Sequence, residues 1–299
     1  MHLIIETPTW LGDSVMASGA IEKLIKHLKP TKVTLFGSFV STSLFPEYEV
    51  IIDKRDSRLK NFFNMPKADM FVSFRRSLYS KLLALKIGGY TLKKSGIGHL
   101  SEQYNSYINS ILKQELPNFA PKLKFIPKSY DTITVGINPG AAFGAAKRWY
   151  PKEFAKVANA LNAKIIIFGG PGEEEMAKAI EENLETKNYI NLCGKLSIKE
   201  LCESIGGLDL LVTNDSGPMH IAASYGVKTV AIIGPTSYKH TYPYNTDYKI
   251  VTKNLECAPC NKRVCPLKTH ACMKEITACD VIKAIRELNS KIVKEDSEC

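Results

Sequence analysis

No apolar run in the sequence approaches the roughly 18 to 20 residues that a membrane-spanning helix requires. The first ten residues, MHLIIETPTW, lack the basic start and the small-residue cleavage site of a signal peptide. Internal repeats, low-complexity tracts and a full GxGxxG dinucleotide fingerprint are also missing. We therefore expect a folded protein that stays in the cytoplasm.

Motifs for nucleic-acid recognition are missing too, although the chain is basic. It carries a net charge of +10, and residues 1–130 hold 19 Lys and Arg against 10 Asp and Glu, a net +9. A helix-turn-helix pattern, an RNP-like aromatic motif and a two-histidine finger are all absent, so charge alone supports nucleic-acid binding weakly. We expect no nucleic-acid partner. The basic half is either a solvated surface or a face for phosphates or an anionic membrane leaflet.

The length of 299 residues, with 44% hydrophobic and 23% charged residues, suits two folded domains. Three prolines interrupt the segment 116–130, which suggests a linker. We place an N-terminal domain at 1–130 and a C-terminal domain at 131–299. The last helical stretch, 280–293, is a candidate to pack back on the N-terminal domain.

Both halves alternate short apolar runs with stretches of helical periodicity, which predicts parallel sheets covered by helices. The fold class we predict is α/β, with two Rossmann-like, doubly wound domains facing a cleft. The expected strands lie at 2–6, 32–38, 50–53 and 68–74 in the first half, and at 132–140, 164–172, 189–194, 208–214 and 228–234 in the second. The expected helices lie at 15–28, 77–89, 151–162, 173–184, 198–205 and 218–226.

The stretch 212–227, VTNDSGPMHIAASYGV, concentrates polar residues between an apolar strand and a helix. Proline is tolerated at the first helical position, so the helix should begin near Pro218 and end at Gly226. Such a turn lies at the carboxyl end of a parallel strand, where ligands bind. The amide groups at the helix start favour an anion there.

Five motifs, in order along the chain, resemble the bacterial ADP-heptose:lipopolysaccharide heptosyltransferases, glycosyltransferase family nine. They are TWLGDSVMA, NPGAAFGAAKRWYP, CGKLSIKEL, TNDSGPMHIAASYGVKTVAIIGPT and CAPCNKRVCPLKTHACMKEI. The motif sequences are most similar to those of the heptosyltransferase II branch, which adds the second heptose of the inner core. The resemblance implies a GT-B fold and inverting transfer of heptose from ADP-heptose to the heptosyl-Kdo inner core. Donor binding then falls to the C-terminal domain and acceptor binding to the N-terminal one.

Further expectations follow from this resemblance. The partners are the ADP-heptose donor and a Kdo-lipid A acceptor at the inner membrane leaflet, so the protein is cytoplasmic and peripheral to that membrane. No cofactor is implied. The DxD metal motif of other glycosyltransferases is absent, so we expect no metal dependence.

Asp13 is the candidate catalytic base, because it matches the family's catalytic aspartate in the pair Gly12–Asp13 and follows the first strand. The alternative is that Asp13 only caps a helix starting at Ser14 or Val15. Gly12 would allow close approach of the substrate, or serve the turn.

Lys195 resembles the family lysine that contacts the donor phosphates, and an ordinary solvated lysine is the alternative. Ser197 is expected to cap the following helix, with Glu200 completing a capping box. Asp215 would accept hydrogen bonds from sugar hydroxyls or orient a basic neighbour, and a helix cap is the alternative. The remaining donor-binding candidates supply backbone amides or a side-chain donor to the diphosphate: Ser216, Gly217, Met219 and His220. For His220, a packed core histidine is an equal alternative.

Lys147 and Arg148 are candidate contacts for phosphates of either substrate, and the adjacent Trp149 is expected to pack in the core. Arg75 and Arg76 follow a strand and are hypothetical contacts for the phosphorylated acceptor.

Four cysteines near the C-terminus, with His270 close by, are spaced by two, four and six residues. The pattern is compatible with zinc, but it is no standard finger, and the cytoplasm disfavours stable disulfides. We favour free or packed thiols at Cys257, Cys260, Cys265 and Cys272.

Competing functional hypotheses remain. The first is heptosyltransferase I or another member of family nine. The second is a two-domain ligand-binding protein without turnover, which would need no base at Asp13. The third is a basic nucleic-acid protein with a zinc module, for which strongly salt-dependent oligonucleotide binding is the test.

Overall fold

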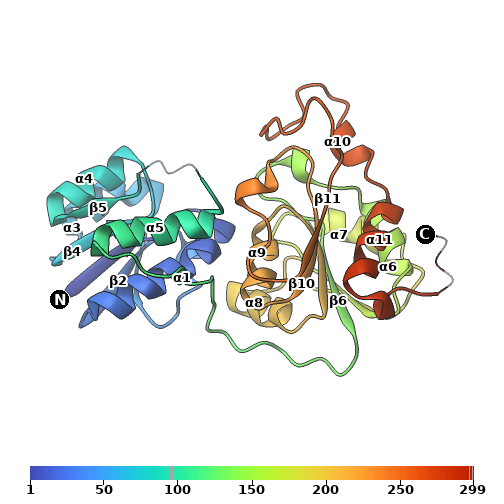
Figure 1. The fold of residues 1–299 in the computed structure, drawn as a ribbon, viewed down its shortest axis with the longest axis horizontal. Helices are drawn as coiled ribbons and strands as arrows, with labels where there is room; N and C mark the ends of the chain where they lie inside the picture. Colours follow the sequence, from blue (N-terminus) through green and yellow to red (C-terminus); the bar gives the residue numbers. More distant parts are fainter. Residues whose placement is uncertain (94–96, 296, 298) are drawn as a thin grey trace. The chain divides into compact units, whose positions relative to one another are not determined.

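The computed structural model describes residues 1–93, 97–295, 297 and 299, and the chain divides into two compact units, Met1–Lys124 and Phe125–Cys299 (Figure 1). The division falls within the proline-rich segment 116–130, six residues before the boundary predicted at 130. The first part of this segment is held by the N-terminal unit, where the Lys122 amide donates to Ser18 Oγ over 2.9 Å. Its last part is held by the C-terminal unit, where the Tyr130 hydroxyl donates to the Ser204 carbonyl over 3.0 Å.

The N-terminal unit is built on a five-stranded parallel sheet with the order β3-β2-β1-β4-β5. The four strands predicted in this half are present, and the three-residue β5 was not predicted. The strands are β1 His2–Glu6, β2 Lys32–Gly37, β3 Glu49–Ile52, β4 Met70–Ser73 and β5 Gly89–Thr91. The helices are α1 Leu11–Leu28, α2 Phe39–Thr42, α3 Arg58–Asn64, α4 Leu78–Ile87 and α5 Leu100–Leu112, with a 3-10 turn at Arg55–Ser57.

Apolar side chains on one face of this sheet pack beneath α3 and α4. Ile4, Phe36 and Phe71 are fully buried there, against Leu83 of α4. Right-handed connections place α1, which follows β1 in one direction, on the opposite face from α4, which follows β4 in the other. α1 packs beside α5, a helix that the sequence analysis did not predict (Figure 1).

The C-terminal unit contains a six-stranded parallel sheet with the order β11-β10-β9-β6-β7-β8. The five predicted strands are present, and β11 was missed. The strands are β6 Thr134–Asn138, β7 Lys164–Ile167, β8 Tyr189–Asn191, β9 Leu210–Asn214, β10 Lys228–Ile232 and β11 Tyr248–Val251. The helices are α6 Pro151–Asn159, α7 Glu174–Glu181, α8 Ile198–Gly206, α9 Gly217–Ser224, α10 Ala271–Lys274 and α11 Ala278–Leu288, with 3-10 turns at Ala145–Lys147, Tyr238–His240 and Ser290–Ile292.

Helices cover both faces of this second sheet (Figure 1). Val135, Ile137 and Val212 belong to the large core shared with α6, α7 and α11, while Met219 of α9 packs against Ala231 on the other face. The last helix, α11, packs on α6 and β11 of its own unit. Both units are therefore doubly wound parallel α/β structures, as the sequence predicted.

Each sheet has one point at which the direction of winding reverses. In the N-terminal unit it lies between β1 and β4, and in the C-terminal unit between β6 and β9. In open α/β sheets, ligands bind outside the carboxyl ends of the strands at such a switch point. The two switch points are thus where functional side chains are expected.

Two further features bear on the predictions. Cys279 and Cys299 form a disulfide, so the expectation that the chain lacks stable disulfides is wrong for this pair. It ties the start of α11 to the C-terminal residue and lies outside the cysteine motif 257–272. Within the part of the chain that the structure describes, no helix has the length and apolar character needed to cross a membrane.

Candidate active site

Asp13 lies at the switch point of the N-terminal unit, in the first turn of α1. The helix begins at Leu11 and not at Ser14 or Val15, so Gly12 and Asp13 are its second and third residues and Trp10 occupies the N-cap position. Asp13 is therefore not the capping residue that the alternative interpretation required. Its side chain is half-buried, and the positive end of the helix dipole favours its negative charge.

Tyr104 of α5 is a neighbour of Asp13 that the sequence analysis missed. Burial raises the pKa of the Tyr104 hydroxyl well above 10, the Asp13 carboxylate raises that pKa further, and Arg76 opposes the rise. Asp13 and Arg76 therefore lie close enough to act electrostatically on the same phenol. No motif in the sequence signals Tyr104, because its helix was not predicted.

Arg75, one of the two predicted acceptor contacts, is engaged within the protein. Its guanidinium donates to Asp53 Oδ2 over 2.7 Å and to the Thr7 carbonyl over 2.7 Å, and lies 3.4 Å from Glu6 Oε1. The Arg75 side chain joins the ends of β1, β3 and β4. Arg76, in contrast, is exposed. Of the two, only the Arg76 side chain is exposed enough to remain a candidate ligand contact.

Glu6, the last residue of β1, is fully buried at the same switch point. It accepts a hydrogen bond from the Ser73 hydroxyl at the end of β4. Burial raises the pKa of the Glu6 carboxyl above its usual 4.5, while Arg75 and Ser73 oppose that rise. Because one arginine, Arg75, is shared between the carboxylates of Glu6 and Asp53, the negative charge of Glu6 is only partly neutralised.

We predict that Glu6→Gln gains stability relative to the wild type as the pH rises above 4.5. The folded protein holds the Glu6 proton more tightly than the unfolded chain, so Glu6 lowers the free energy of unfolding progressively as the pH rises from 4.5 through the raised pKa. Thermal unfolding of both proteins from pH 4 to pH 8 measures the difference.

The matched control is Glu49→Gln, whose effect should have the opposite sign. A hydrogen bond from Lys32 lowers the pKa of the exposed Glu49 carboxyl, so its contribution is lost as the pH falls. A pH-independent difference between Glu6→Gln and the wild type would contradict the assignment.

Asparagine side chains connect the two strands at the switch point of the C-terminal unit. Asn138, at the end of β6, donates to Ser216 Oγ over 3.0 Å and to Thr213 Oγ1 over 3.2 Å. Asn214, at the end of β9, donates to the Pro139 carbonyl over 2.6 Å. These bonds fix the turns NPG and NDSG beside each other. Sequence reasoning singled out the two motifs but not these asparagines, whose signal was an amide side chain at each strand end.

Asp215 forms a largely buried ion pair with Lys147. Lys147 Nζ lies 2.6 Å from Asp215 Oδ2, and the two side chains are 13% and 9% exposed. The Thr236 hydroxyl donates to the same oxygen over 2.6 Å, and the Lys147 ammonium also lies 4.8 Å from the centre of the Phe143 ring. Asp215 therefore orients a basic neighbour, and it is not the N-cap of the following helix, because Ser216 occupies that position.

Asp215 and Ser216 lead directly into α9, which begins at Gly217, one residue before the predicted start. The Met219 amide donates to the Ser216 carbonyl over 3.2 Å, so it is already used within the turn. Pro218 has no amide hydrogen to donate. This leaves the amides of Ser216 and Gly217 as the better anion donors. His220 is buried in the first turn of the helix.

The other candidates in this unit differ in how they are held. Lys195 is exposed in the loop after β8, and its ammonium donates to the Asn191 carbonyl over 2.8 Å. Arg148 lies 3.9 Å from Glu173 and is partly exposed.

Trp149 is buried and donates through Nε1 to the Ile276 carbonyl, which confirms its core role. The capping box predicted for Ser197 and Glu200 is also confirmed.

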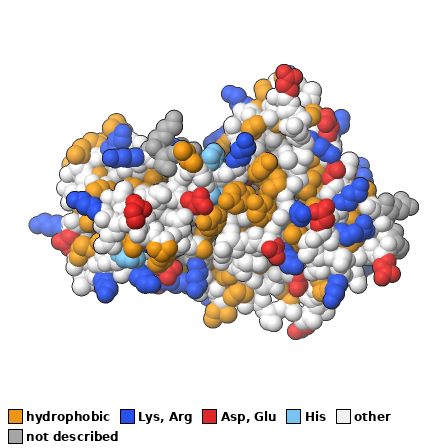
Figure 2. All heavy atoms as spheres, in the orientation of Figure 1, with side chains coloured by type: hydrophobic (Ala, Val, Ile, Leu, Met, Phe, Trp, Pro, Cys, Tyr) orange, Lys and Arg blue, Asp and Glu red, His pale blue; other side chains and the backbone are white. Residues whose placement is uncertain are grey.

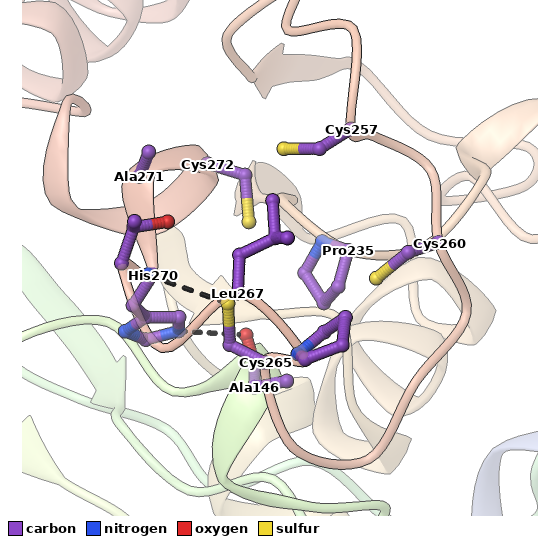
Figure 3. Close-up of a pocket in the computed structure, with 11 residues that line it drawn as sticks. Ala146, Pro235, Cys257, Cys260, Cys265, Leu267, His270, Ala271 and Cys272 are labelled. Carbon is purple, nitrogen blue, oxygen red and sulfur yellow. Dashed lines mark hydrogen bonds between the residues drawn. The ribbon is translucent and has the colours of Figure 1, made fainter.

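The four cysteines of the C-terminal motif line one pocket with His270 (Figure 3). Both ring nitrogens of His270 are engaged, one 3.1 Å from the Tyr150 hydroxyl and the other 2.9 Å from the Ala146 carbonyl. Among the described residues, no group of three or more His, Cys, Asp or Glu side chains is placed to hold a metal ion. None of these four cysteines forms a disulfide.

Cys265 should be the most reactive thiol of this pocket towards iodoacetamide near neutral pH. Hydrogen bonds from the backbone amides of His270, Leu267 and Lys268 lower its pKa, whereas burial and the neighbouring cysteines raise the pKa of Cys272. The thiolate is the reactive form, so peptide mass mapping should find Cys265 alkylated before Cys272. Cys265→Ser is the control. Equal protection of all four thiols, relieved by a chelator, would instead indicate bound metal.

Comparison with known proteins agrees with this architecture. Residues 98–271 match the family described as glycosyltransferase family 9 (heptosyltransferase). The chain is 39% identical to lipooligosaccharide heptosyltransferase 2 of Campylobacter jejuni, over 97% of this chain and 100% of that protein. ADP-heptose lps heptosyltransferase II of Escherichia coli has a similar fold, with a TM-score of 0.80 at 22% identity over 96% of this chain and 98% of that one. The family 9 glycosyltransferase of Veillonella parvula gives a TM-score of 0.80 at 23% identity, over 96% of both chains.

The two solved structures confirm the predicted GT-B fold class. The family match covers more than half of the chain, and the relative from C. jejuni matches it along nearly its whole length. The chain therefore belongs to glycosyltransferase family 9, the heptosyltransferases, and is an enzyme of that family.

Proposed function

We propose that the enzyme transfers heptose, with inversion, from ADP-heptose to the heptosyl-Kdo inner core of lipopolysaccharide or lipooligosaccharide. The name of the C. jejuni relative, which matches along its full length, supports this substrate class. The observation that carries the chemistry is the half-buried carboxylate of Asp13 in the first turn of α1, at the switch point of the N-terminal sheet.

In this proposal Asp13 acts as the general base. It takes the proton from the acceptor hydroxyl as that oxygen bonds to the anomeric carbon of the heptose. The bond from that carbon to the diphosphate breaks on the opposite face, and ADP leaves with the electron pair. Arg76 supplies positive charge for acceptor phosphates, and Gly12 leaves room for the substrate beside the helix start.

The C-terminal unit would bind the donor at its own switch point. The Ser216 and Gly217 amides and the start of α9 favour the diphosphate. The Lys147 ammonium adds positive charge beside that turn and is held by the Asp215 carboxylate, which also accepts a hydrogen bond from Thr236. We assign further phosphate contacts to Lys195, Arg148 and His220. These cations and amides stabilise the negative charge that develops on the diphosphate as ADP leaves. The acceptor carries lipid tails, so we also propose that the enzyme is peripheral to the inner membrane leaflet.

Incubation with ADP-heptose and core acceptors carrying zero, one or two heptoses tests the proposal. We expect ADP release together with growth of the one-heptose acceptor only. Growth of the acceptor without heptose would instead indicate heptosyltransferase I. Donor binding without ADP release on any acceptor would indicate a ligand-binding protein and contradict the proposed function.

A further inference from the structure

Helix α4 presents a stripe of leucines to solvent. Leu78, Leu82 and Leu85 are 73%, 44% and 82% exposed, while Leu83 and Ala84 on the opposite side are buried in the core. The spacing i, i+4, i+7 places the three exposed leucines on one side of the helix. The helix therefore has an apolar side in the core and a second apolar side that nothing in its own unit covers.

The neighbouring helix α3 extends this apolar surface. Its Leu59 and Phe63 are 77% and 73% exposed. The two helices are joined at both ends: the Tyr79 hydroxyl donates to the Arg58 carbonyl over 2.9 Å, and Lys86 Nζ lies 4.8 Å from the centre of the Phe62 ring. We call the resulting surface the α3–α4 face; it consists of Leu59, Phe63, Leu78, Leu82 and Leu85.

The helices of the C-terminal unit provide an internal comparison. Among the described residues, the large apolar side chains that are well exposed include none from α6, α7, α8, α9 or α11. Those helices bury their large apolar residues, so an exposed apolar helix surface is not a general property of this chain. Exposed apolar side chains gathered on two adjoining helices mark an interaction site.

Basic residues border the α3–α4 face. Lys81 and Lys86 lie on the two sides of the leucine stripe by helical geometry, Lys60 lies on α3, and all three are exposed. Neither helix contains Asp or Glu. Figure 2 shows hydrophobic side chains beside Lys and Arg side chains over α4, at the upper left of the view. Apolar residues flanked by lysines are the composition of helices that lie in a membrane interface.

We propose that the α3–α4 face docks the enzyme on an anionic lipid bilayer, with the leucine stripe entering the interface and Lys60 and Lys81 contacting lipid phosphates, while the Lys86 ammonium stays bonded to the Phe62 and Phe63 carbonyls of α3. The inference rests on the proposed function, in which the acceptor is itself a lipid. A second copy of the chain is a poorer occupant, because an isologous contact would bring the same lysines of both copies together and leave their charges uncompensated.

The position of the face relative to the candidate acceptor site supports the proposal. α4 begins two residues after Arg76, at the carboxyl ends of the strands. Leu78, at the start of the stripe, therefore lies at the same edge of the N-terminal sheet as Asp13. A lipid-anchored acceptor could keep its tails in the bilayer while its sugar reaches this edge.

Flotation of the purified full-length enzyme with vesicles tests the docking. We compare vesicles of phosphatidylethanolamine and phosphatidylglycerol with vesicles of phosphatidylcholine alone. Leu78→Gln/Leu82→Gln/Leu85→Gln should reduce partition onto the anionic vesicles about tenfold or more, because three apolar side chains no longer enter the interface. Lys81→Glu should reduce it by about fivefold or more, and added salt should weaken the binding.

The matched control is Ile126→Gln/Ile190→Gln, which removes exposed apolar side chains from the C-terminal unit and should leave partition unchanged. Turnover of a soluble, deacylated one-heptose acceptor separates docking from catalysis, and the triple variant should retain it within about twofold. Equal partition of the triple variant and the wild type would overturn the proposal. So would a dimer in sedimentation that the triple substitution dissociates, because a second copy would then cover the face.

Discussion

Replacing Asp13 with asparagine should lower kcat by about 10²- to 10⁴-fold, the usual contribution of a positioned general base. Asparagine has nearly the same shape but cannot accept the proton of the acceptor hydroxyl. The first turn of α1 should persist, because Asp13 is its third residue and Trp10 occupies the cap position. Donor affinity should also persist, because the proposed donor site consists of residues of the C-terminal unit.

The measurement is ADP release at saturating donor and one-heptose acceptor, together with donor affinity by calorimetry and the melting temperature. Asp56→Asn is the matched control, since Asp56 is an exposed acid of the same unit outside the proposed site. It should leave kcat within about twofold of the wild type. Retention of most activity by Asp13→Asn would remove Asp13 from the role of base.

Most strands of the two sheets were predictable from the sequence, because each is a short apolar run followed by a polar turn. The two strands that were not predicted are short or weakly apolar: β5 has three residues, GYT, and β11 has four, YKIV. Both lie at sheet edges, where a strand needs less burial than in the centre. Helix α5 was missed because polar residues interrupt its sequence, LSEQYNSYINSIL, although much of its length is buried against α1.

The sequence located the turns of the candidate site but not the partners of its charged side chains. Arg75 was correctly placed in a loop after a strand, yet its partner Asp53 comes from the end of a different strand, 22 residues earlier. Likewise, Lys147 and Asp215 are separated by 68 residues and meet only because β6 and β9 are neighbours in the sheet. Pairings of this kind depend on strand order, which local periodicity does not report.

A shared principle connects the two units. In each, side chains at the ends of the two strands flanking the switch point bind one another: Ser73 with Glu6 in the first unit, and Asn138 with Thr213 in the second. These bonds fix the ends of the two strands at each switch point. Asp13 in one unit and Ser216 in the other lie in the segments that follow these fixed strand ends. Rigid elements of this kind favour precise placement of functional groups.

Lys147→Met should destabilise the C-terminal unit by about 3 kcal/mol, because it removes the ammonium that is paired with the buried Asp215 carboxylate. Methionine retains most of the aliphatic stem of lysine, so the change is mainly one of charge, including loss of the ammonium near the Phe143 ring. If Lys147 also neutralises the diphosphate, kcat/KM for the donor should fall by about 10²-fold. Chemical denaturation and initial rates at varied ADP-heptose measure the two effects.

The exposed pair of Lys156 and Glu153 is a matched control, because its Nζ–Oε1 distance is also 2.6 Å while the lysine side chain is 65% exposed. Lys156→Met should cost no more than about 0.5 kcal/mol, since solvent screens an exposed pair. The double variant Lys147→Met/Asp215→Asn should recover much of the lost stability, because no buried charge then remains unpaired, but it should not recover donor turnover. Recovery of both stability and turnover would mean that Lys147 serves only to neutralise Asp215. The leaving diphosphate would then be stabilised by the Ser216 and Gly217 amides and by the other proposed phosphate contacts, Lys195, Arg148 and His220.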